Sequence, residues 1–341
     1  MHRKIALFAG GRDQAAEDWT KGSNLSASED VDEIPPPNIA AVEGIGSAPL
    51  PSSLERIRPR VETALLAGFL AILGMLTIGL LLPLVVVLVR PPAESLQESV
   101  PADEGIKPLA ARYPGMLVLF SLLPQLMLAA LALGGSWLSP DGWRQRLGLT
   151  AGSMPKRFWI LFALSTPVIS VVTGLLISQL TDHLSQRMQE LGGLYGGHTG
   201  LFGLLALSLP TLVPGLCEEL LFRGYVQTRL LKAWQSWKAI LVTSLLFSAA
   251  HLSPIHALGV FPLSLWLGII AMRCGCIWPA IFGHTANNLF ALTVLLASPR
   301  ATTVPQISIA LSLFFAISTC AWIASIFHLS SRPVATRSHE S

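Results

Sequence analysis

Charged side chains are scarce in this chain, and their scarcity excludes two broad classes of protein. Only 13% of the 341 residues are Asp, Glu, Lys or Arg, whereas 52% are hydrophobic. A soluble globular protein has about 25% charged residues, and a disordered protein has few hydrophobic ones. We therefore expect an all-α, polytopic membrane protein whose helices satisfy their own backbone hydrogen bonds in the lipid bilayer.

Two further absences narrow the function. The chain has four cysteines, none of them in a predicted outer loop, so we expect no disulfide. Cys274-Gly275-Cys276 could be half of a metal site, but it has no second cysteine pair and is interpreted as membrane packing. No repeat of fixed period is found, which argues against a transporter built from inverted repeats.

Long uncharged stretches predict about eight transmembrane helices, because roughly 20 apolar residues span the hydrocarbon core. The uncharged window 239–272 has 34 residues, and Leu252-Ser253-Pro254 predicts a tight turn that divides it into two helices. The eight helices are expected at about 64–89, 116–137, 158–180, 200–224, 237–252, 255–272, 276–297 and 304–328.

The distribution of Lys and Arg predicts the orientation, because cytoplasmic loops hold the excess of these residues. With the N-terminus inside, five of them fall in outer loops: Arg90, Lys107, Arg112, Arg187 and Arg300. Thirteen fall on the inner side: Arg56, Arg58, Arg60, Arg144, Arg146, Lys156, Arg157, Arg229, Lys232, Lys238, Arg273, Arg332 and Arg337. Both termini are therefore expected in the cytoplasm, with the protein in the plasma membrane. This bias accounts for the net charge of +3, so no nucleic-acid partner is expected.

Composition divides the chain into four parts. Residues 1–60 are polar and proline-containing, which is typical of a disordered cytoplasmic tail. Residues 61–199 are expected to hold the N-terminal transmembrane helices and loops, 200–299 further membrane helices with ionisable residues, and 300–341 the last helix with a short cytoplasmic tail. The glycine-rich loop 181–199 is either a flexible connector or a mobile gate over a membrane cavity.

The fourth predicted helix carries two adjacent acids. Pro210, Pro214 and a glycine precede them and are expected to kink the helix. Glu219 and Arg223 are four residues apart and should meet on one face, which leaves Glu218 without a partner in the same helix. A carboxylate in an apolar place is suited to act as a proton acceptor near neutral pH. The alternative is a charge cluster at the membrane interface, with Arg223 extended to the cytoplasm.

Two further pairs lie at helical spacing in apolar stretches. Phe247 and His251 share one face of the fifth predicted helix, and His284 and Asn288 share a face of the seventh. An imidazole N–H and an asparagine amide are suitable donors to an oxyanion. Each pair alone is also compatible with hydrogen bonding in a helix core, and His256 is interpreted as a residue at a helix end.

Taken together, the pairs resemble the three motifs of the CAAX-processing and bacteriocin-processing (CPBP, or Abi) family of intramembrane proteases, which includes prenyl-protein endopeptidases and relatives of lysostaphin resistance protein A. The motifs are Glu218-Glu219-x-x-x-Arg223, Phe247-x-x-x-His251 and His284-x-x-x-Asn288. The resemblance spans about 204–297, which implies that residues 200–299 form the catalytic core. It implies helices that enclose a catalytic cavity open to the cytoplasm, and an endopeptidase that acts on membrane-associated or lipidated peptides.

The resemblance also implies roles for the motif residues. Glu218 and His251 would activate a water molecule, and His284 and Asn288 would stabilise the tetrahedral oxyanion. The remaining motif residues would have supporting roles: Glu219, Arg223 and Phe247. Peptide hydrolysis would then proceed without a covalent intermediate and without a required cofactor.

Three alternatives remain open from the residues. Zinc is possible, because Glu218, His251 and His284 would supply three ligands and leave a fourth position for water. The chain has no His-Glu-x-x-His helix and Asn288 is a poor zinc ligand, so the metal-independent mechanism is favoured. The other two are a proton-coupled transporter and a non-catalytic scaffold or immunity protein.

Overall fold

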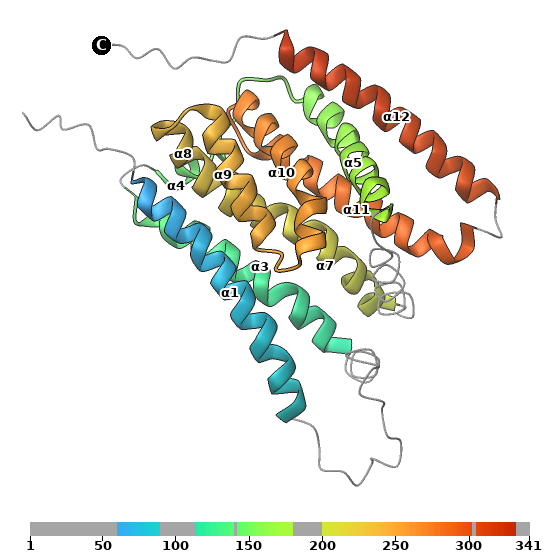
Figure 1. Ribbon diagram of the computed structural model, residues 1–341, viewed down its shortest axis with the longest axis horizontal. Coiled ribbons are helices and arrows are strands. Elements are labelled where there is room, and N and C mark those ends of the chain that lie inside the picture. Colours follow the sequence, from blue (N-terminus) through green and yellow to red (C-terminus); the bar gives the residue numbers. More distant parts are fainter. Residues whose placement is uncertain (1–59, 89–113, 140–141, 180–199, 302–304, 332–341) are drawn as a thin grey trace, which may run out of the picture. The chain divides into compact units, whose positions relative to one another are not determined.

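The computed structural model describes residues 60–88, 114–139, 142–179, 200–301 and 305–331. Within these ranges the chain is helical and contains no strand, so the all-α prediction is confirmed for them. The elements, shown in Figure 1, are α1 (Val61–Leu88), α3 (Pro114–Trp137), α4 (Trp143–Arg146), α5 (Arg157–Ser178), α7 (Gly200–Glu219), the π-helix η4 (Leu220–Gln227), α8 (Thr228–Ala233), α9 (Ser236–Ala249), α10 (Pro254–Cys274), α11 (Trp278–Ala301) and α12 (Pro305–Ser330).

Each of the eight predicted helices has a counterpart, and some of them contain described segments that are long and apolar enough to cross a membrane. Four described segments meet both conditions: Val61–Leu81, Arg157–Ser178, Pro254–Cys274 and Ile309–Ser330. The 14 residues of α9 extend over about 21 Å, short of the roughly 30 Å hydrocarbon core. The number of eight membrane spans therefore stays a prediction.

The predicted turn between α9 and α10 is confirmed. Leu252 has φ of 59°, a left-handed conformation that is uncommon for a residue with a branched side chain. Ser253 caps α10 by accepting a hydrogen bond from the His256 backbone N–H, and Pro254 begins the helix, where its missing N–H costs nothing. The turn therefore fixes the direction in which the chain leaves α9.

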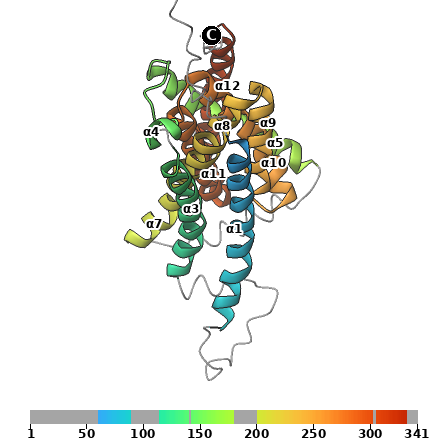
Figure 2. The same ribbon diagram turned by 90° about the vertical axis from the view of Figure 1, so that its left-hand side faces the viewer.

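Side chains on α1 are distributed as in a membrane helix. Ala64, Ala67 and Ala71 are buried against neighbouring helices, while the large side chains of Phe69 and Leu80 are exposed. Small residues at helix contacts and large apolar residues facing outward are typical of proteins surrounded by lipid. Figure 2 shows α1 beside α3, and the two helices are in contact. Together with the four apolar spans, this pattern makes the chain an integral membrane protein.

The helices that carry the motifs pack on one another through small residues. The α11 helix contacts α5 and α7, α9 contacts α10, and α3 contacts α7. Gly215 of α7 lies directly against Thr285 of α11, where a β-carbon would collide with the threonine hydroxyl. This close approach brings the end of α7 next to His284.

Several predictions lie outside the described residues. They are the predicted disordered N-terminal tail, of which residues 1–59 are not described, the predicted connector or gate formed by loop 181–199, and the predicted short C-terminal tail from residue 332 onward.

All four cysteines are free thiols, as the sequence predicts. Cys274 and Cys276 are buried where α10 passes into α11, and the Cys274 sulfur lies 3.6 Å from the Met154 sulfur. Burial raises the pKa of the Cys276 thiol, against a smaller opposing effect of a hydrogen bond from the Trp278 backbone. The thiol therefore stays protonated near neutral pH and acts as a packing group.

Candidate functional site

The two acids lie at a change of helix type. The α7 helix runs through Pro214 and Gly215 without interruption and ends at Glu219. The π-helix η4 follows at once, so the departure from α-helical geometry comes after the acids rather than before them. Long π-helical segments are rare, and they occur often at functional sites.

Glu219 and Arg223 form a fully buried ion pair, as their spacing predicts. Arg223 Nη1 donates to Glu219 Oε1 over 2.8 Å. Glu219 is 0% exposed and Arg223 is 1% exposed. Arg223 Nη2 donates to the hydroxyl and to the backbone carbonyl of Ser264 on α10, over 2.8 and 3.0 Å. The guanidinium lies 4.5 Å from the ring centre of Phe247. Arg223 therefore does not extend to the cytoplasm, and the interpretation of an interfacial charge cluster is wrong.

Glu219 also fixes the orientation of His284. Its Oε1 lies 2.9 Å from His284 Nδ1. A carboxylate paired with arginine is ionised and can only accept, so the hydrogen in this contact is on Nδ1. His284 Nε2 is thereby turned toward Glu218, whose Oε2 lies 3.9 Å away.

Glu218 has a partner that the sequence did not indicate. Gln125 of α3 donates from Nε2 to Glu218 Oε1 over 3.0 Å, and the two residues are 7% and 8% exposed. Glu218 Oε2 is buried and has no hydrogen-bond partner among the described residues. The prediction that Glu218 has no partner within its own helix therefore stands, and its partner comes from α3.

Phe247 connects His251 to this cluster. Its ring centre lies 5.0 Å from that of His251 and 5.9 Å from that of His284. His251 lies in the turn just past the end of α9, and its Nδ1 is 2.9 Å from the Phe247 carbonyl oxygen. A carbonyl can only accept, so Nδ1 carries the hydrogen and Nε2 is left for other partners.

Asn288 is the one predicted site residue without a hydrogen bond or ring contact to the other predicted site residues among those that the structure describes. It is half-buried on α11, one turn after His284, and no hydrogen bond links it to another described residue of the cluster. Its neighbour Asn287 is more deeply buried, and its side-chain oxygen lacks a partner among the described groups. The oxyanion role of Asn288 remains a prediction.

The zinc alternative requires three ligands at one point. Across the ranges that the structure describes, no three His, Cys, Asp or Glu side chains lie close enough together to hold a metal ion. Glu218, His251 and His284 are thus not arranged as a three-ligand set, and their present positions do not fit a zinc ion.

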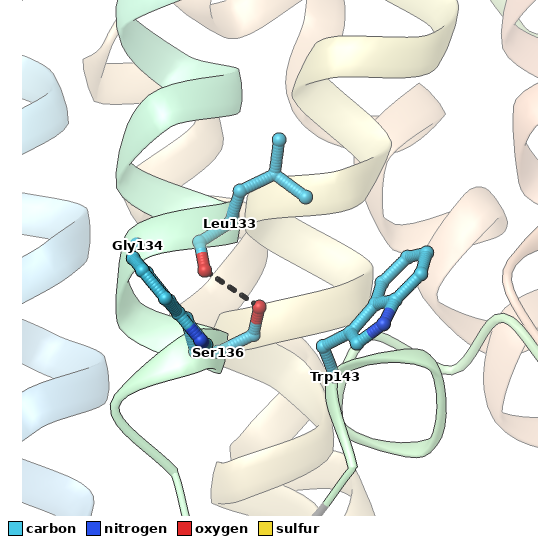
Figure 3. Close-up of a pocket in the computed structure, with 5 residues that line it drawn as sticks. Leu133, Gly134, Ser136 and Trp143 are labelled. Atoms are coloured by element: carbon cyan, nitrogen blue, oxygen red, sulfur yellow. Dashed lines mark hydrogen bonds between the residues drawn. The ribbon is translucent and has the colours of Figure 1, made fainter.

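A hollow of about 370 Å³ lies elsewhere on the surface, where α3 ends and α4 begins. Leu133, Gly134, Ser136, Trp137 and Trp143 line it, and the Ser136 hydroxyl donates to the Leu133 carbonyl, as Figure 3 shows. None of these side chains is ionisable at neutral pH. The hollow is therefore not the catalytic cavity expected from the motifs.

Comparison with protein families gives a match that falls on the helices described above. Residues 200–290 match the model of the type II CAAX prenyl endopeptidase Rce1-like family. The chain matched none of the curated proteins and none of the solved structures with which it was compared. The matched segment includes the two acids, His251, His284 and Asn288, so the family resemblance drawn from the motifs is confirmed over residues 200–290, which are similar to the Rce1-like prenyl endopeptidases.

Proposed function

We propose that the chain is an intramembrane endopeptidase that hydrolyses peptide bonds of membrane-associated or lipidated peptides. The observation that carries the proposal is the pair of buried side chains Glu218 and His284, which face each other inside the Rce1-like segment. Intramembrane ionisable groups are costly, and they are retained where they act.

In the proposed reaction, Glu218 accepts a proton from water as the water attacks the peptide carbonyl. The same proton then passes to the leaving amine, so the enzyme returns to its starting state without a covalent intermediate. His251 orients the water through Nε2. His284 and Asn288 stabilise the oxyanion. Because Nδ1–H of His284 already donates to Glu219, this role requires a second hydrogen on Nε2, that is, an imidazolium.

The substrate class follows from the family description, which names a prenyl endopeptidase. A first probe is therefore a peptide that ends in a farnesylated Cys-aliphatic-aliphatic-X sequence, reconstituted with the protein in vesicles. The same peptide without the lipid tests whether lipidation matters. We place the enzyme in the plasma membrane, with both termini and the opening of the site toward the cytoplasm.

Replacing His251 by alanine is expected to lower kcat for the farnesylated peptide about 100-fold or more, the contribution typical of a group that assists proton transfer. His256→Ala is the matched control, because the two rings lie only 4.7 Å apart and His256 contributes to the cap of α10 through its backbone. The control should lose much less activity than His251→Ala, because the His256 ring packs beside His251 but has no part in the proposed reaction. Product formation is followed by mass spectrometry. Equal activity of the wild type and both variants would remove His251 from the mechanism.

Treatment with a strong chelator is expected to leave cleavage unchanged, because the reaction is proposed to need no metal. The purified protein is stripped, its metal content is measured, and the rate is compared before and after zinc is added back. Complete loss of cleavage that zinc restores would contradict the metal-independent mechanism and reinstate Glu218, His251 and His284 as ligands.

A further inference from the structure

Gln125 is a buried polar residue in a helix that the family match does not reach. The α3 helix ends at Trp137, well before the matched segment begins at residue 200. Gln125 nevertheless makes a hydrogen bond of 3.0 Å to Glu218, across 93 positions of sequence. A primary amide in an apolar helix is costly unless it is paired, so its place against Glu218 needs a physical reason.

The contact gives the two oxygens of the Glu218 carboxylate different surroundings. Oε1 accepts the hydrogen bond from Gln125, whereas Oε2 is buried, has no hydrogen-bond partner in the described part of the chain, and lies 3.9 Å from His284 Nε2. A carboxylate held at one oxygen cannot rotate freely about its last bond. Its other oxygen is then presented in a constant direction.

The chemical nature of the donor suits a base. An arginine or lysine in this place would neutralise the carboxylate by forming an ion pair, as Arg223 does for Glu219. The Gln125 amide donates one hydrogen bond and carries no charge, so it holds Glu218 without itself neutralising the carboxylate. The two adjacent acids are thus given different partners, which fits different roles.

We infer that Gln125 is a positioning residue, which holds the Glu218 carboxylate so that Oε2 is the oxygen that takes the proton from water. This inference rests on the proposed function of Glu218. It places part of the site on α3, outside the segment that matches the Rce1-like family.

Gln125→Met tests the inference, because methionine keeps the length of the side chain and removes the donor. In the farnesylated-peptide assay we expect kcat to fall between about 10-fold and 100-fold, the size associated with a lost hydrogen bond to a charged group, with KM unchanged. Gln227→Met is the matched control. Gln227 is also a buried glutamine, but its amide donates to the Gly268 carbonyl on α10 over 2.9 Å. If Gln125 only supported the fold, the two variants would lose similar stability and similar activity.

A second measurement does not depend on cleavage. Thermal unfolding in detergent is compared for Gln125→Met, Glu218→Leu and the double variant. If the contact exists, the melting temperature of the double variant falls by clearly less than the sum of the single shifts. Additive shifts, or wild-type kcat in Gln125→Met, would overturn the inference. If the wild type cleaves neither peptide while the shifts are non-additive, the proposed substrate class fails and the contact between Gln125 and Glu218 stands.

Discussion

Glu218→Gln is expected to lower kcat by about 1,000-fold or more, within the range that general-base catalysis contributes. The substitution keeps the shape of the side chain, and the Gln125 amide can still donate to the oxygen of the new residue. What it removes is the ability to accept a proton from water. The loss should therefore appear in kcat for the farnesylated peptide, with little change in KM or in the melting temperature.

Glu62→Gln is the control for this prediction. Glu62 lies in the first turn of α1 and is exposed, so the same chemical change occurs away from the site. Its variant should cleave at the wild-type rate. Substantial cleavage by Glu218→Gln would show that another residue is the base. If the wild type instead transported protons across vesicle membranes and Glu218→Gln did not, the transporter alternative would be favoured.

Arg223→Met is expected to have the largest effect on stability, about 3–5 kcal/mol in the free energy of unfolding, the cost typical of breaking a buried ion pair from one side. The guanidinium donates to Glu219 and to Ser264, and both of these residues are fully buried. Its removal leaves the buried Glu219 carboxylate without its arginine partner and with the hydrogen bond from His284 Nδ1 alone among the described residues. Denaturant unfolding in detergent measures the change.

Arg144→Met supplies the comparison. Arg144 is exposed and lies 5.2 Å from the ring centre of Trp143, an arrangement that contributes about 0.5–1 kcal/mol at exposed sites. If Arg223→Met were no more destabilising than Arg144→Met, the buried pair would not hold α7, η4 and α10 together. Arg223→Lys should recover part of the stability, because it restores one charge but not both sets of hydrogen bonds.

Contacts within one helix could be predicted from the sequence, and contacts between helices could not. The pairing of Glu219 with Arg223 follows from a spacing of four residues, and the turn before α10 follows from Leu252-Ser253-Pro254. Both are local consequences of backbone geometry. The alternation of apolar and charged stretches likewise predicted where the long helices lie, within a few residues of their observed ends.

The contacts of Gln125 and Ser264 could not be predicted from the sequence. They contact Glu218 and Arg223 across 93 and 41 positions of sequence. Nothing local to either residue indicates its partner, although a lone glutamine in an apolar helix is a signal that some partner exists. The π-helix η4 was also missed, because its residues differ little in composition from an ordinary apolar helix.

One oxygen atom, Glu219 Oε1, accepts from both Arg223 and His284. The same atom therefore serves both the buried ion pair and the imidazole to which we assign a part in the proposed reaction. No single replacement of Glu219 separates these two contacts. This sharing limits how such a protein drifts over evolutionary time. A descendant that gives up catalysis and survives as a passive membrane component should have replaced Glu218 or His251, while Glu219 stays fixed by the demands of folding alone. In such a lineage, an intact Glu219-x-x-x-Arg223 pair would record ancestry and not activity.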